Sequence, residues 1–239
     1  MTPDRHIVAI GGGSFRTHPG NAIESFLLAL TGKERPRVLF LPTAGGDQEG
    51  TIELFERSFL AGRCTPRVLR LFAREHEDLA PIVLEQDLIF VGGGNTANQR
   101  AIWRVHGVDA LLARAWGQGA VLAGVSAGAL CWFEEGVTDS FHPTRLAALH
   151  GLLGFLPGSF CPHYDSEATR RPLYQAFVGE GTLAPGFAAD DGVGLVFRGT
   201  EFMEAVSFMP GASAWRVEPS DHGPPGTASE TRIPARLLS

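Results

Sequence analysis

The 239-residue sequence predicts an α/β fold, in which a mostly parallel sheet lies between two layers of helices and a short β-hairpin follows near the C-terminus. Two observations predict this three-layer fold. Over the first two hundred residues, short apolar runs alternate with segments whose apolar residues recur every three or four positions, as alternating strands and helices do. The apolar runs hold few polar residues, which is typical of strands that helices cover on both faces.

The elements follow in chain order. Strands are predicted at residues 6–10, 37–42, 67–72, 87–91 and 120–125. The segments at 22–30, 52–59 and 102–112 carry apolar residues at helical spacing and predict helices between the strands. After residue 137 glycine and proline become frequent, and one helix is predicted over about 166–178. Two last apolar runs, 192–197 and 202–206, flank Arg198-Gly199-Thr200 and predict the hairpin.

One domain is expected over residues 1–218, because no internal repeat or long linker interrupts it. Residues 219–239 are polar and rich in glycine and proline, so we expect a frayed tail or a strap on the surface. No apolar run approaches the ~20 residues of a membrane span, and no early segment has the pattern of a secretory leader. Cys64, Cys131 and Cys161 cannot all pair and match no zinc-binding or CxxC spacing, which predicts a reducing compartment, the cytoplasm, and no metal.

The charges exclude several functions. With 20 basic and 26 acidic residues the net charge is −6, so nucleic acid is not an expected partner. Lys33 is the one lysine in the chain, which excludes a phosphate-binding GxxxxGK[ST] loop and leaves no buried candidate for a Schiff base.

The glycine runs at 11–13 and 92–94 do not form the dinucleotide-binding motif GxGxxG, since Arg16 and Ala97 stand where the last glycine belongs.

The segment Gly124-Val125-Ser126-Ala127-Gly128 fits GxSxG and lies between a predicted strand and a run of small residues. In this context the motif predicts a nucleophile elbow, a strained turn that presents the serine hydroxyl. The free N–H groups of a helix that begins there would suit an oxyanion. The alternative reading is a serine that caps a helix.

A serine nucleophile needs a base. His163 is the best candidate, because Pro162 restricts the backbone before it and could hold the imidazole still. His18, His142 and His150 are alternatives that also lie in predicted loops. The remaining histidines are placed in a strand, on solvated helices or in the tail; they are His6, His76, His106 and His222.

An acid must orient the imidazole. Asp191 is the first choice, in Asp190-Asp191-Gly192 at the start of a predicted strand. Asp190 is the near alternative and Asp139 the more distant one. Two aspartates beside a glycine are also ordinary turn chemistry, so the residues alone leave this choice open.

Four motifs in order give the chain a close resemblance to the peptidase E (α-aspartyl dipeptidase) family over residues 7–217. They are the early Gly-Gly-Gly, Phe90-Val-Gly-Gly-Gly-Asn-Thr96, Gly124-Val-Ser-Ala-Gly-Ala129 and Pro162-His163-Tyr164. The resemblance implies a cytoplasmic serine peptidase with a class I glutamine-amidotransferase-like (flavodoxin-like) fold, no cofactor and a short peptide as its substrate; it leaves a homodimer open. Related amidotransferases have cysteine at the elbow, where this chain has Ser126.

Carried over residue by residue, the resemblance implies that Ser126 is the nucleophile and His163 the general base. It places Gly93, Gly94 and the Ala127 amide at the oxyanion hole. The position of the third catalytic residue differs within the family, so Asp191 and Asp139 both stay open.

Two further residues are implied to bind substrate. Asn95 looks like a contact in the loop of Gly93 and Gly94, and Arg170 stands where family members carry a similar arginine. The planar guanidinium of Arg170 suits the carboxylate of an N-terminal aspartate, although a solvated helix arginine is the competing interpretation.

Three functions therefore compete. The first is a dipeptidase that prefers Asp-X, and the second is a serine exopeptidase of other specificity or a cyanophycinase-like enzyme on the same scaffold. The third is a binding module that keeps the scaffold without catalysis.

Overall fold

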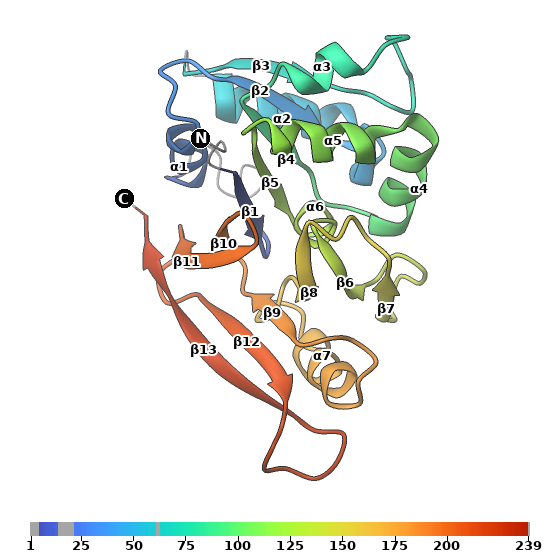
Figure 1. The fold of residues 1–239 in the computed structure, drawn as a ribbon, viewed down its shortest axis with the longest axis vertical. Helices are drawn as coiled ribbons and strands as arrows, with labels where there is room; N and C mark the ends of the chain where they lie inside the picture. Colours follow the sequence, from blue (N-terminus) through green and yellow to red (C-terminus); the bar gives the residue numbers. More distant parts are fainter. Residues whose placement is uncertain (1–4, 14–21, 61–62, 239) are drawn as a thin grey trace.

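The structure, a computed structural model, describes residues 5–13, 22–60 and 63–238. Within this part of the chain one sheet of 13 strands runs through the molecule, and helices pack against its faces (Figure 1). The mixed α/β class and the central sheet flanked by helices are confirmed.

One of the alternative bases, His18, lies outside the described residues.

The five strands predicted in the first half form the parallel part of the sheet. They are β1 (His6–Ile10), β2 (Arg37–Leu41), β3 (Thr65–Val68), β4 (Leu88–Val91) and β5 (Val121–Val125). They lie in the order β3-β2-β4-β5-β1, with each neighbouring pair parallel. The strand expected at 67–72 is displaced, because the chain leaves the sheet after Val68. There the carboxylate of Asp47 accepts hydrogen bonds from the amides of Leu71 and Phe72, at 2.6 and 2.9 Å.

Helices cover both faces of this part. They are α1 (Ala22–Leu30), α2 (Glu49–Leu60), α3 (Ala80–Leu84), α4 (Thr96–His106) and α5 (Val108–Gly117). Along β1 the side chains alternate, with Val8 in the core under α1 and α2 and Ile7 in the core under α3, α4 and α5. The helical segment expected at 102–112 is divided at Gly107, whose φ of 68° ends α4. Among the described helices none has the length and apolar character needed to cross a membrane.

The second half supplies the remaining elements. They are α6 (Ala127–Leu130), β6 (Phe133–Thr138), β7 (Ala147–His150), β8 (Leu156–Cys161), α7 (Arg170–Gly179), β9 (Gly186–Ala189), β10 (Val193–Arg198), β11 (Glu201–Ser207), β12 (Ser213–Pro219) and β13 (Ala228–Leu237). Beyond β1 the sheet continues in the order β10-β11-β13-β12-β9-β8-β6-β7. β10 and β11 form the predicted antiparallel hairpin, and β10 pairs antiparallel with β1.

The sequence pattern does not reveal β6 and β8, because glycine interrupts β6, and proline and glycine interrupt β8. Their glycines have a packing role. Gly136 on β6 lies so close to the carbonyl oxygen of Phe160 on β8 that a Cβ at this position would collide with it. β6 and β8 run parallel, with a register shift between Phe133 and Glu135.

The C-terminal segment differs from the expected tail. Residues 228–237, part of the predicted tail 219–239, form the ten-residue strand β13. This strand pairs antiparallel with β12 and, at its last residues, parallel with β11, so it joins the two parts of the sheet (Figure 1). Most of its side chains are exposed, and the apolar ones that pack against the core are Ala228, Ile233 and Ala235. Such a polar strand carries too little hydrophobic alternation to be recognised from sequence.

A buried carboxyl lies on α1. Glu24 is 1 % exposed, and a hydrogen bond with Ser58 and the charge of Arg63 offset only part of the cost of burying its carboxylate. Burial raises the pKa of Glu24 to about 7. In the unfolded chain this carboxyl loses its proton near 4.5, whereas in the folded protein it keeps the proton until about 7. Between these values the unfolded state binds fewer protons, so stability falls as the pH rises.

We predict that Glu24→Gln removes this loss. At pH 8 the variant should be more stable than the wild type by roughly 3 kcal/mol or less, and at pH 4 the difference should vanish. Urea unfolding between pH 4 and 8 measures it, with the exposed Glu53→Gln as a control for the loss of one negative charge. An identical fall in stability with pH in wild type and Glu24→Gln would contradict the prediction.

Candidate active site

Ser126 occupies a sharp turn between β5 and α6. Its φ of 56° and ψ of −116° lie outside the regions that residues other than glycine favour, as a nucleophile elbow requires. The two glycines of the motif make the turn sterically allowed. A Cβ at Gly124 would collide with the carbonyl oxygen of Gly128, and a Cβ at Gly128 would collide with that of Val91 on β4. The elbow can therefore pack against its neighbours only with glycine at both of these positions.

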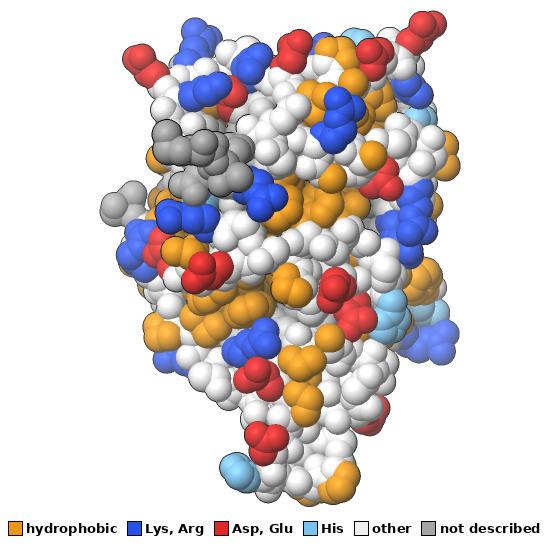
Figure 2. All heavy atoms as spheres, in the orientation of Figure 1, with side chains coloured by type: hydrophobic (Ala, Val, Ile, Leu, Met, Phe, Trp, Pro, Cys, Tyr) orange, Lys and Arg blue, Asp and Glu red, His pale blue; other side chains and the backbone are white. Residues whose placement is uncertain are grey.

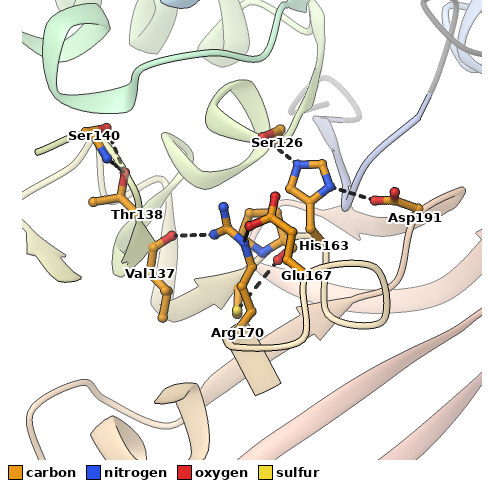
Figure 3. Close-up of polar contacts among 10 residues, drawn as sticks. Ser126, Val137, Thr138, Ser140, His163, Glu167, Arg170 and Asp191 are labelled. Atoms are coloured by element: carbon orange, nitrogen blue, oxygen red, sulfur yellow. Dashed lines mark hydrogen bonds and ion pairs between the residues drawn. The ribbon is translucent and has the colours of Figure 1, made fainter. Parts of the chain in front are cut away.

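The imidazole of His163 lies between Ser126 and Asp191 (Figure 3). Its Nε2 is 2.9 Å from the Oγ of Ser126, and its Nδ1 is 2.7 Å from the Oδ1 of Asp191. The carboxylate can only accept, so Nδ1–H donates to Asp191 and Nε2 is left to accept the serine proton. The structure thus brings together the three residues that the sequence analysis selected.

Strand topology explains how these three distant segments meet. Ser126 follows β5, His163 comes two residues after β8, and Asp191 two residues after β9. β8 and β9 are parallel neighbours, so their carboxyl ends lie at the same edge of the sheet. A bridge between Gly12, just after β1, and Asp191 brings that edge to the carboxyl ends of β1 and β5.

The hydrogen bond from His163 holds the pKa of Asp191 below its ordinary value. Burial opposes this shift, and the nearby charge of Arg170 supports it. The carboxylate therefore stays ionised at neutral pH and favours the tautomer of His163 in which Nδ1 carries the proton.

Two residues that the sequence analysis did not single out support this pair. The backbone amide of Asp191 donates to the Oδ1 of Asp165 at 2.8 Å. A Cβ at Gly12 would collide with both the Asp191 carboxylate and the His163 ring, so only glycine fits there. In the sequence, the glycine run after β1 was the one sign of this site. Its glycine at position 12 leaves space for the side chains of the His–Asp pair.

The alternative acids point elsewhere. Asp190 is buried, and its carboxylate accepts from the amide of Ser213 at 2.9 Å and from the indole N–H of Trp215 at 3.2 Å. Asp139 is exposed in the turn after β6. In the part of the chain that the structure covers, neither carboxylate has a hydrogen bond to His163.

A cleft of about 250 Å³ opens at Ser126. Its lining consists of the elbow, the His–Asp pair and three glycines, namely Gly13, Gly93, Gly94, Val125, Ser126, His163 and Asp191. Gly94 has a φ of 142°, and a Cβ there would collide with the carbonyl of Ala44. The amides of Gly93, Gly94 and Ala127 donate to no other group within the described ranges, so they are free to bind an oxyanion.

Asn95 has its side chain engaged within the protein. Its Oδ1 accepts from the Asn98 amide at 2.8 Å and caps α4, while its Nδ2 donates to the carbonyl of Ser140 at 2.9 Å. These bonds hold the glycine loop in place at the start of α4. The expected role of Asn95 as a substrate contact stays a prediction.

Arg170 is the first residue of α7 and is 3 % exposed, so it is no solvated helix arginine. Its Nε donates to Glu167 at 2.7 Å, and one terminal nitrogen donates to the carbonyl of Val137 at 3.3 Å. In Figure 3 its guanidinium points toward the carbonyl of Val137. Its role in substrate binding stays a prediction.

Comparison with known proteins agrees with this geometry. The family model described as peptidase family S51 matches residues 7–205. The uncharacterized peptidase YgaJ of Bacillus subtilis is 46 % identical over 235 residues, which cover 98 % of this chain and 99 % of that protein.

Two solved structures have a similar fold. A peptidase from an acI-B1 Actinobacterium has a TM-score of 0.70 and 19 % identity, over 98 % of this chain and 96 % of that one. A putative peptidase E protein from Listeria monocytogenes has a TM-score of 0.63 and 16 % identity, over 86 % of this chain and 100 % of that one. Family model and relative together place this chain, a serine-type peptidase, in peptidase family S51.

Proposed function

We propose that this peptidase hydrolyses dipeptides with an N-terminal aspartate, through an acyl-enzyme formed on Ser126. The observation that carries the chemistry is the line of hydrogen bonds from Ser126 through His163 to Asp191 at a strained elbow. A hydroxyl is a weak nucleophile at neutral pH, and a base within hydrogen-bond reach activates it.

In the proposed mechanism, His163 takes the proton of Ser126 as Oγ attacks the scissile carbonyl. The amides of Gly93 or Gly94 and of Ala127 bind the oxyanion of the tetrahedral intermediate. The protonated His163 then gives its proton to the leaving amine, and Asp191 stabilises the imidazolium in between without taking its proton. Water, activated by the same imidazole, releases the acyl group from Ser126.

The size of the cleft and the position of Arg170 support the substrate class. A cleft of about 250 Å³ is smaller than the 300–1,000 Å³ that larger ligands occupy, which favours a short peptide. Arg170 supplies a buried positive charge beside the catalytic residues, suited to the side-chain carboxylate of aspartate.

A second specificity is favoured by the contacts of Arg170. Its bonds to Glu167 and to the carbonyl of Val137 already give the guanidinium a structural role. An exopeptidase of other specificity, or a cyanophycinase-like enzyme, is therefore the alternative function.

We also propose that the protein works in the cytoplasm as a cofactor-free enzyme. Its three cysteines are buried free thiols, as a reducing compartment favours. A homodimer stays a prediction.

The first prediction concerns the nucleophile and base. Ser126→Ala and His163→Ala should each lower kcat by as much as roughly 10⁶-fold, and the double variant should be no worse than either, because the two side chains act as one unit. Labelling by a serine-directed phosphonate should occur at Ser126 in the wild type and be lost in His163→Ala. Additive losses, or labelling that survives without the imidazole, would contradict this mechanism.

A second prediction concerns the acid. Asp191→Asn should keep the fold and lower kcat by about 10⁴-fold, because an amide no longer selects the tautomer of His163. Asp139→Asn is the matched control and should retain full activity. Circular dichroism checks that both variants fold. Equal losses in the two variants, or a loss in Asp139→Asn alone, would show that the wrong acid was assigned.

A third prediction concerns specificity. Arg170→Met should lower kcat/KM for Asp-Leu by at least about tenfold relative to Asn-Leu and Ala-Leu, because the substrate carboxylate loses its cation. Thermal unfolding of the variant accounts for the lost bonds to Glu167 and Val137. Unchanged selectivity for Asp-Leu in a folded Arg170→Met protein would favour the alternative specificity.

A further inference from the structure

A second cavity, of about 260 Å³, lies away from the catalytic cleft. It is formed by α4, the start of α5, Cys131 just after α6, and residues 151–155 before β8. It shares no lining residue with the cleft at Ser126. The elements that enclose it lie together on the right of Figure 1.

A buried amide with few partners faces this cavity. Gln99 on α4 is 0 % exposed, and among the described groups the thiol of Cys131, a weak hydrogen-bonding group, is the partner of its side chain. A buried amide that lacks most of its hydrogen bonds destabilises the fold. A ligand that bonds to this amide would recover that cost.

The cavity also carries positive charge without a carboxylate partner. Arg100 and Arg104 both line it, and neither forms an ion pair within the described ranges. The Nε of Arg100 is buried and has no acceptor there. Burial lowers the pKa of Arg100, and repulsion from Arg104 adds to the effect. A bound anion beside Arg100 would offset both the burial of its charge and the repulsion from Arg104.

The rest of the lining is apolar, apart from one acid. Leu152, Leu153, Phe155 and the ring of Trp103 supply an apolar wall, and Asp109 at the start of α5 supplies one carboxylate. In Figure 2, hydrophobic and charged side chains lie interspersed along the right edge of the face shown, on the side where Figure 1 has α4.

We propose that this cavity is a second binding site, for a free α-amino acid with an apolar side chain such as leucine. The carboxylate of the amino acid would pair with Arg100, its ammonium group with Asp109, and its side chain would lie against Leu152 and Phe155. The cavity is below the size range of pockets for larger ligands, about 300–1,000 Å³, which excludes an oligopeptide or a nucleotide. Binding here does not require peptidase activity.

The test uses the full-length protein and three probes of one shape. L-leucine carries both charged groups, 4-methylpentanoate lacks the ammonium group, and isoamylamine lacks the carboxylate. Calorimetric titration should show the tightest binding for leucine, weaker binding for 4-methylpentanoate and none for isoamylamine. No binding of leucine, or equal binding of the amine, would overturn the proposal.

Variants locate the binding. Arg100→Ala should weaken leucine binding at least tenfold, and Arg114→Ala, an exposed arginine on α5 outside the cavity, should not change it. Gln99→Leu should weaken binding and raise the Tm of the free protein, because it removes a buried amide that lacks most of its hydrogen bonds. Leucine should slow hydrogen exchange at residues 99–110 and 151–155. Affinity unchanged in both cavity variants, a lower Tm for Gln99→Leu, or protection confined to the cleft at Ser126 would each overturn it.

Discussion

The candidate active site depends on how closely the neighbouring chain can approach the imidazole of His163. This ring is bonded on one side to the elbow after β5 and on the other to the loop after β9. Both approaches need glycine. Gly12 leaves the space that the His–Asp pair occupies, and Gly128 lets the elbow lie against β4. A side chain at Gly12 would displace the His–Asp pair, and one at Gly128 would push the backbone of the elbow away from β4. Either change would alter the Ser126–His163 distance.

The sequence predicts much of the parallel half, for a physical reason. Four of its strands, β1, β2, β4 and β5, are buried on both faces, so each is a nearly continuous apolar run. Ser126 is found because an elbow needs a fixed local pattern. The strands of the second half are harder to predict from the sequence. β6 and β8 contain glycines that serve close strand contacts, and β13 has little apolar alternation. A local pattern of apolar residues does not indicate which distant strands pair, and it does not identify a polar strand.

The same limit applies within the site. Whether Asp191, Asp190 or Asp139 orients the imidazole depends on the pairing of β8 with β9, which no short segment encodes. The burial of Arg170 likewise depends on the neighbouring strand β6, whose Val137 carbonyl it contacts. Sequence reasoning could name these candidates by residue type, but only the fold decides which of them the imidazole reaches.

The segment beyond the family match is tied to the catalytic half. The match ends at residue 205, whereas Glu230 on β13 accepts hydrogen bonds from Tyr164, next to His163, and from Arg171 and Gln175 on α7. The guanidinium of Arg171 also lies over the ring of Trp215, 4.2 Å from its centroid. Without β13, Tyr164, Arg171 and Gln175 would all lose their hydrogen bonds to Glu230, so β13 stabilises α7. The C-terminal strand therefore helps to hold the loop that carries His163.

The short helix α6 lies between the cleft at Ser126 and the second cavity. Only four residues separate Ser126 at its start from Cys131 in the lining of the second cavity, so the cleft and the cavity are connected by about one helical turn.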